Sequence, residues 1–565
     1  MFIEFLLLSA ELTIIKYTHM SGFETIDIIV FVAYIMLIVG IGLWVSRDKV
    51  GHQKNAEDYF LAGKSLPWWA IGASLIAANI SAEQIIGMSG SGFAVGLAIA
   101  TYEWMAAITL LIVGKFLLPI FIEKKLYTIP EFVEQRFNTT LKTILAVFWI
   151  ALFVFVNLTT VIFLGAKALD TIFGVGDGSL IWASLIGLAL IAAAYSIYGG
   201  LSAVAWTDVV QVVLLVLGGL VTTFIALDQV TPDGGVLRGI NHIYDVAGDK
   251  FQMILDRDNP EFNNLPGIAV LVGGMWVANL YYWGFNQYII QRTLAAKSLE
   301  ESQKGIVFAA FLKLIIPLIV VIPGIVAYVM FSQPEGTNTI PGVVEAFTKA
   351  GGGLDNDKAY PWLISEFVMP GFKGLVVAAL AAAIVSSLAS MLNSVATIFT
   401  MDIYKPYFNR EATDKQTVTV GRLTAIVALI IAVLVAPQLS NIPQMFQYIQ
   451  EYTGLVSPGI LAVFIMGLFW KKTTTKAAIY GVLSSIVIAL LLKVPSLELP
   501  FLTQMYYTLI LTIVVIAGVS LTTNPNDDDP KAIITTSETF KTSRSFNIGA
   551  YTVLIITAVL YAIFW

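Results

Sequence analysis

Long apolar stretches dominate this chain and are separated by short polar segments. A helix needs about 20 predominantly apolar residues to span the hydrocarbon core of a bilayer. No segment alternates apolar and polar residues with period two, so the sequence does not support a β-barrel. The pattern predicts an all-α polytopic membrane protein with about fourteen spanning helices, over residues 25–45, 66–95, 98–122, 143–170, 179–198, 204–227, 267–290, 305–331, 370–402, 419–437, 442–470, 474–495, 501–522 and 546–565.

Two of these apolar stretches, one in each half of the chain, are interrupted by polar residues and glycines. The first interruption covers residues 77–84 and runs into a Gly/Ser-rich segment over 87–92, and the second covers residues 273–284. An interrupted helix leaves backbone amides and carbonyls unpaired, and lipid cannot hydrogen-bond to them, so these groups must line a cavity enclosed by protein. Matched interruptions in two halves of a chain indicate the binding site of a secondary transporter.

The spacing of the interruptions predicts internal symmetry. About five spans separate the two broken segments, and an odd number of spans gives the two units opposite orientations in the membrane. The sequence therefore predicts a single transport domain over residues 1–565 whose core is two inverted five-helix repeats, the first helix of each being broken. We expect residues 25–65 to form an extra first helix and a cytoplasmic loop, 66–228 and 267–470 to form the repeats, and 474–565 to add three helices.

Composition narrows the function classes. The chain has 565 residues, of which 57% are hydrophobic and only 12% are charged, against roughly 25% charged residues in soluble proteins. A net charge of −6 argues against nucleic acid as a partner. The absence of cysteine excludes disulfides and cysteine nucleophiles. No P-loop or zinc-protease motif is present, so the sequence predicts no organic cofactor, no enzyme and no ATP-driven pump.

Lys and Arg residues predict the orientation. They concentrate in one set of alternate loops, which include residues 47–64, 124–142, 292–304, 405–422, 471–476 and 531–544, and an excess of Lys and Arg marks cytoplasmic loops. With an even number of spans, both termini then lie on the outer side. The long loops over 228–266 and 332–369 would also be outside, as lids over a pathway or as simple connectors. Residues 1–16 make a poor signal peptide, and translation starting at Met20 is an alternative to Met1.

A helix rich in small residues near 379–394 offers ligands for a cation. Small residues there are consistent with close helix packing alone. The second interpretation adds the hydroxyls of Ser386 and Ser387 and the carbonyl of Ala383 to free carbonyls at the first break, those of Ala77 and Ile80. Hard cations such as sodium bind oxygen ligands. Because this ligand set contains no carboxylate, it favours a monovalent ion such as sodium over a divalent one.

Several polar side chains at membrane depth are candidates for solute binding. Glu103 and Lys313 each lie inside a span, where a charge costs roughly 2.5–3.5 kcal/mol on insertion scales; they could form a structural ion pair or face a substrate. Their charges and three carboxamides together suit a polyhydroxylated solute, and nearby aromatic rings could pack against a sugar. The carboxamides are those of Gln84, Asn279 and Gln450, and the rings are those of Tyr102, Tyr282, Trp283 and Phe446.

Asp208 is a further candidate, near the cytoplasmic end of its span. Its carboxylate could pair with a basic loop residue, or it could attract a cation that leaves toward the cytoplasm. The sequence does not separate these two roles.

The chain also resembles the sodium:solute symporter family, and within it the bacterial members of the sodium–glucose cotransporter type. The resemblance extends from about Ile26 to Trp565, and the matching stretches are residues 58–63, 81–84, 198–203 and 383–394. It implies a ten-helix inverted-repeat core with one helix before it and three after it, in a bacterial inner membrane. It also implies a sodium site at Ala77, Ile80, Ala383, Ser386 and Ser387, a galactose site at Gln84, Glu103, Asn279, Lys313 and Gln450, and Tyr282 as the inner gate. Ala106 departs from the galactose-transporting pattern, which has serine there.

These observations predict a secondary active symporter that couples inward sodium movement to uptake of galactose or glucose by alternating access. Its partners would be the sugar, sodium and the lipid bilayer, and no feature of the sequence indicates an oligomeric state. A sodium symporter for another solute, such as sialic acid, inositol or an amino acid, is the nearer alternative. A sugar sensor or leak channel is the more distant one.

Overall fold

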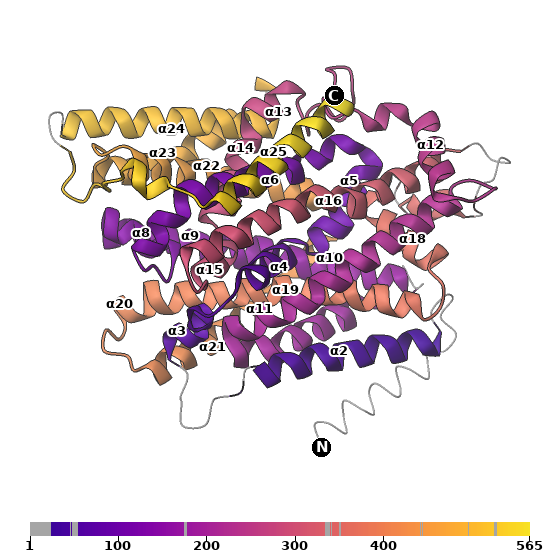
Figure 1. The fold of residues 1–565 in the computed structure, drawn as a ribbon, viewed down its shortest axis with the longest axis horizontal. Coiled ribbons are helices and arrows are strands. Elements are labelled where there is room, and N and C mark those ends of the chain that lie inside the picture. Colours follow the sequence, from indigo (N-terminus) through magenta and orange to yellow (C-terminus); the bar gives the residue numbers. More distant parts are fainter. Residues whose placement is uncertain are drawn as a thin grey trace.

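The computed structural model describes residues 24–45, 47, 55–173, 178–333, 340, 342–349, 352–440, 442, 445–494, 497–524 and 528–565. Within these ranges the chain is helical, and its only β contacts are two isolated bridges. Among the described residues, eleven helices are long and apolar enough to cross a membrane, or twelve if one bent pair is counted as a single span. Figure 1 shows them as a bundle of long helices running in roughly the same direction. The prediction of an all-α polytopic membrane protein is confirmed, whereas the count of fourteen spans stays a prediction.

The first half of the chain contains the first broken segment. Its α-helices are α2 (Thr25–Val45), α3 (Ala56–Leu61), α4 (Trp68–Asn79), α5 (Ser89–Ala94), α6 (Thr101–Ile112), α7 (Leu118–Glu123), α8 (Ile129–Arg136), α9 (Thr139–Leu152), α10 (Thr159–Ile172), α11 (Ile181–Gln229) and α12 (Val236–Val246). Short 3-10 or π-helical pieces join them: η1 (Ala62–Lys64), η2 (Glu83–Met88), η3 (Leu97–Ala100), η4 (Val113–Leu117), η5 (Phe153–Leu158) and η6 (Gly248–Phe251).

The second half begins with the other broken segment. Its α-helices are α13 (Ile268–Val272), α14 (Gly274–Phe285), α15 (Gln287–Leu294), α16 (Leu299–Ser332), α17 (Val343–Phe347), α18 (Ala359–Phe367), α19 (Phe372–Ile398), α20 (Lys405–Tyr407), α21 (Asp414–Val435), α22 (Met445–Phe469), α23 (Thr475–Leu492), α24 (Phe501–Thr523) and α25 (Arg544–Ile563). The shorter pieces are η7 (Asn356–Lys358), η8 (Phe399–Tyr404), η9 (Ala436–Leu439) and η11 (Ser537–Phe540).

The first predicted break is present between α4 and η2, where the chain bends by 62°. The Ser81 amide donates to Gln84 Oε1 at 3.3 Å, and the Glu83 amide donates to Ser81 Oγ at 3.1 Å. Serine and other short polar side chains compete with the helix for backbone groups in this way. Local side-chain hydrogen bonds therefore end α4 at Asn79.

The second segment breaks at Gly273, where the predicted interruption begins, but it is helical over the rest of the predicted range. The chain leaves helical geometry at Gly273 and again at Asn286, while α14 between them is a regular helix. Asn279 therefore lies inside α14, where its side-chain amide donates to the Met275 carbonyl at 3.2 Å, and not at an unwound position. Gly274 permits close packing of α24, since an added Cβ would lie 1.9 Å from the Leu502 carbonyl oxygen.

The predicted spans over 179–198 and 204–227 correspond to the two parts of α11. They meet at Gly200, whose φ of 65° belongs to the left-handed region that favours glycine. A Cβ added at Gly200 would lie 2.3 Å from the Tyr59 carbonyl oxygen, so the turn has no room for a side chain at this position.

Helix α19 occupies the interior of the bundle. In the most apolar window of Phe372–Tyr407, 94% of the residues are buried, against 17% for both Thr25–Val45 and Arg544–Ile563. Figure 1 accordingly places α2 at one edge of the bundle and the C-terminal helices α23, α24 and α25 at the opposite edge. The run of alanines and serines in α19 lets neighbouring backbones approach closely, as small residues do in membrane proteins.

A carboxylate on α2 fixes the first turn of α19. Asp27 is buried, and its Oδ1 accepts hydrogen bonds from the amides of Gly371 at 2.7 Å and Gly374 at 2.6 Å. The first amides of a helix have no partner inside the helix, and a negative charge there is also favoured by the helix dipole. The edge helix thus anchors the innermost helix.

We predict that Asp27→Ala lowers the free energy of unfolding by about 2 kcal/mol, because two helix amides lose a charged acceptor. Thermal unfolding of the purified protein in detergent measures this loss. Asp258→Ala, at an exposed loop position, is the matched control and should change nothing. Equal stability of the two variants would contradict the anchoring role of Asp27.

Candidate functional site

A cavity lies between the first broken helix and α14. All nine residues that the sequence predicted for solute binding line it: Gln84, Tyr102, Glu103, Asn279, Tyr282, Trp283, Lys313, Phe446 and Gln450. They come from η2, α6, α14, α16 and α22, which are far apart in the sequence. The fold therefore brings the predicted polar and aromatic side chains to one place.

A buried ion pair crosses this cavity. The Lys313 ammonium donates to the Glu103 carboxylate and to the side-chain oxygen of Asn79, and it lies 5.1 Å from the centre of the Trp283 ring. Both charged groups are buried, and both line the cavity. The two interpretations of this pair, structural and solute-facing, are thus compatible, because a pair that neutralises itself still presents donors and acceptors to the cavity.

Tyr282 connects the two broken segments. Its hydroxyl accepts a hydrogen bond from Asn79 Nδ2 at 3.0 Å and another from the Tyr288 hydroxyl at 2.6 Å. Its ring packs edge-on against Trp283, with ring centres 5.1 Å apart. On the opposite wall, Tyr102 and Phe446 form a similar edge-on pair. Tyr282 is therefore held in place by side chains from both segments, which suits the position of a gate.

Further polar residues that the sequence analysis did not single out also line the cavity: Asn79, Glu83, Asn157, Asn286 and Thr453. Asn79 and Glu83 lie in the first break, so position alone could have indicated them. Asn286 lies seven residues after Asn279, on the same face of the segment, and helical periodicity could have indicated it. Asn157 lies in the π-helical turn η5 of an otherwise apolar span, so a polar residue at membrane depth was the signal that could have indicated it.

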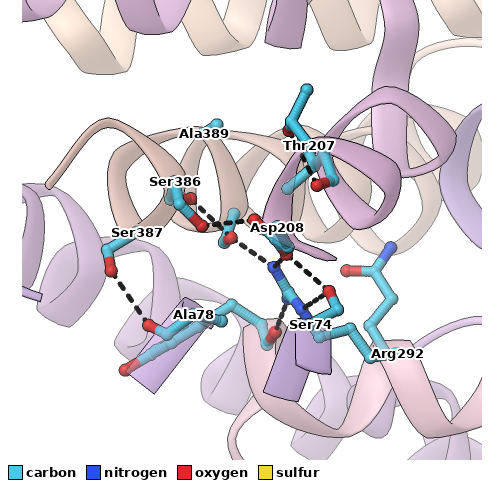
Figure 2. A network of polar contacts seen from close by, with 12 residues as sticks. Ser74, Ala78, Thr207, Asp208, Arg292, Ser386, Ser387 and Ala389 are labelled. Carbon is cyan, nitrogen blue, oxygen red and sulfur yellow. Dashed lines mark hydrogen bonds and ion pairs between the residues drawn. The ribbon is translucent and has the colours of Figure 1, made fainter. Parts of the chain in front are cut away.

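The five residues predicted to bind sodium are all buried where α4 meets α19. Ser387 Oγ donates to the Ala78 carbonyl at 3.0 Å, and the Ser386 hydroxyl donates to Asp208. Figure 2 shows these two serines reaching toward the broken helix and toward Asp208. A hydroxyl that donates its proton keeps lone pairs for a cation, so both serines can still act as neutral ligands beside Ala77, Ile80 and Ala383.

Asp208 forms an ion pair with Arg292, which is the first of the two roles that the sequence left open for Asp208. Arg292 Nη2 lies 3.1 Å from Asp208 Oδ2, and both side chains are buried. Ser74 on α4 joins the two, since it donates to Asp208 at 2.5 Å and accepts from Arg292 Nε at 2.6 Å. Figure 2 shows this network beside Ser386, so the pair lies next to the predicted sodium ligands.

The two long loops both contact α5, the second half of the broken segment. Lys250 Nζ donates to the Ala94 carbonyl at 2.5 Å, and an added Cβ on Gly90 would lie 2.8 Å from both Asn356 and Asp357. Burial raises the pKa of the Asp357 carboxyl to about 7. This buried carboxyl thus lies beside the broken helix.

Comparisons with known proteins identify the family. The family model described as "Sodium:solute symporter family" matches residues 59–485. The chain belongs to this family. It is 64% identical over 544 residues to the "Sodium/glucose cotransporter" of Vibrio parahaemolyticus, an alignment that covers 96% of this chain and 99% of that relative. It is 33% identical to the "Sodium/myo-inositol cotransporter 2" of Homo sapiens, over 83% of this chain and 70% of that relative.

The fold has a solved counterpart. A Na+-coupled sialic acid symporter, solved in a substrate-bound outward-open state, matches with a TM-score of 0.75 and 24% sequence identity, over 90% of this chain and 99% of that one. At this identity the match supports the fold alone. The family membership shows that this protein is a transporter and not an enzyme, and the apolar helices of the described residues make it a multi-pass membrane protein.

We predict that Asp208→Asn and Arg292→Gln each lower the free energy of unfolding by about 3–5 kcal/mol, because each leaves an uncompensated buried charge. The double variant should lose clearly less than the sum of the two, since no charge is left unpaired. Thermal unfolding of the four proteins in detergent gives the coupling energy. Strictly additive losses would show that Asp208 and Arg292 contribute to stability independently, and would contradict the coupling expected of an ion pair.

Proposed function

We propose that this protein is a sodium-driven symporter for galactose or glucose that works by alternating access in a bacterial inner membrane. The observation that carries the proposal is the near full-length similarity to a relative named for sodium and glucose. The cavity supports it, because its lining combines six carboxamides, two carboxylates, an ammonium and aromatic rings. A sugar has hydroxyls on all sides, each of which donates and accepts, and it has apolar ring faces that pack on aromatic side chains.

Sodium would bind where α4 and α19 meet, at the carbonyls of Ala77, Ile80 and Ala383 and the hydroxyls of Ser386 and Ser387. The support is that Ser387 already contacts the backbone of the broken helix. An ion bound there joins the end of α4 to α19 and favours one arrangement of the two helices. Since the end of α4 also lines the sugar cavity, the ion and the sugar would stabilise the same arrangement.

The proposed architecture has fourteen spans. Two inverted repeats, 66–228 and 267–470, form the core, with one helix before them and three after them, and both termini face outward. Tyr282 would be the inner gate below the sugar, and Asp208 would lie on the route by which sodium leaves. The two breaks and the Lys and Arg distribution support this arrangement.

The driving force is sufficient for accumulation. A membrane potential of 100 mV contributes about 2.3 kcal/mol for each charge that moves inward. Because about 1.4 kcal/mol corresponds to a tenfold ratio, one sodium ion per sugar can hold a neutral solute tens-fold more concentrated inside.

We predict that proteoliposomes take up labelled galactose only when an inward sodium gradient is imposed, and that unlabelled glucose competes. If myo-inositol or sialic acid competes for uptake and glucose does not, the competing solute would replace galactose and glucose as the proposed substrate. A sodium current evoked by sugar without accumulation of sugar would favour a sensor or a channel.

Within the same assay, Gln84→Ala and Lys313→Ala should each reduce galactose uptake at least tenfold, because each removes a buried hydrogen-bonding partner of the sugar. Gln252→Ala and Lys297→Ala, at exposed loop positions, are the matched controls and should transport normally. Full uptake by both cavity variants would remove these residues from the sugar site.

A further inference from the structure

The charges that line the cavity do not cancel. Among the described lining residues, three side chains are charged: Glu83, Glu103 and Lys313. Glu103 and Lys313 neutralise each other in their ion pair. An ionised Glu83 would then leave one negative charge in the middle of the protein, where an isolated ion is strongly disfavoured.

The Glu83 side chain has an unused acceptor. It is 6% exposed, and its Oε1 has no hydrogen-bond partner. A charge on Glu83 would act electrostatically on the hydroxyls of Tyr282 and Tyr288. Neither tyrosine supplies a positive charge, and Lys313 is already engaged by Glu103 and Asn79.

Two more orphan oxygens line the same cavity. Oδ1 of Asn157 on η5 and Oδ1 of Asn286 before α15 are buried, and neither has a partner. A buried acceptor without a donor costs about 1–3 kcal/mol. Neutral donors can satisfy the two amide oxygens, but an ionised Glu83 in the same cavity would be stabilised by an occupant that carries positive charge.

We propose that the cavity binds a second monovalent cation, a sodium ion or a proton, at Glu83, with the oxygens of Asn157 and Asn286 as neutral partners. One carboxylate among neutral oxygens matches a single positive charge and not a divalent ion. The site differs from the proposed sodium site at Ser386 and Ser387, which lies between α4 and α19 and has no carboxylate among its proposed ligands. As a role in transport, the proposal rests on the proposed sugar symport.

Two bound cations have an energetic consequence. If both move inward with the sugar, the membrane potential acts on two charges, and the attainable concentration ratio of the sugar is squared. Glu83 is next to Gln84 in the chain, so the second cation would occupy the same cavity as the sugar and would be released with it.

Direct counting of bound ²²Na+ on the purified protein tests the site without any sugar. We expect two sodium ions per wild-type protein, one per Glu83→Gln and one per Ser387→Ala. Asn157→Leu and Asn286→Leu should weaken the same ion that Glu83→Gln removes, which separates a lost site from a misfolded protein. Gln252→Ala is the control and should bind two.

If the second cation is a proton, the wild-type protein binds one sodium ion, and in proteoliposomes an inward proton movement accompanies sugar uptake and is lost in Glu83→Gln. One bound sodium ion without proton movement would overturn the proposal, as would equal counts for the wild type and Glu83→Gln with no proton movement in either. Two bound sodium ions in a protein that transports neither galactose nor glucose would refute the proposed substrate but not this site.

Discussion

A helix that stops in the middle of a membrane protein leaves amides and carbonyls that lipid cannot pair, and α4 stops in this way at Asn79. Side chains pair some of these backbone groups locally. Gln84 Oε1 accepts a hydrogen bond from the Ser81 amide, and the Ser387 hydroxyl donates one to the Ala78 carbonyl. These bonds place polar groups from both sides of the break against neighbouring helices. The cavity and the proposed sodium site both exist because this helix is interrupted.

Two buried ion pairs stabilise the same helix from different sides. Lys313, paired with Glu103, donates to Asn79 at the end of α4, while Asp208 and Arg292 share Ser74 one and a half turns earlier. Removing one member of a buried pair leaves an unpaired charge, so each pair tolerates few arrangements of its surroundings. A movement of α4 therefore has to rearrange both pairs together, which gives the cavity and the α4–α19 contact a physical connection.

Sequence patterns predicted what depends on membrane physics. The lengths of apolar stretches predicted the helices, and glycines and polar residues at membrane depth predicted the first break, as well as side chains such as Gln84 and Lys313 that line the cavity. The pattern failed where tertiary contacts decide. Asn279 looked like part of a break, but α14 is regular there, and its ends at Gly273 and Asn286 follow from packing against α24 and from the turn into α15. Arg292 could be identified as the partner of Asp208 only from the folded chain.

The central claim is that sodium and sugar stabilise the same arrangement of α4. Equilibrium binding of labelled galactose to the purified protein, with and without sodium, tests it most directly in the wild type and in Ser387→Ala. We expect sodium to raise the galactose affinity of the wild type at least tenfold, and this increase to be lost in Ser387→Ala while binding without sodium is retained. An equal sodium effect in both proteins, or none in the wild type, would contradict it.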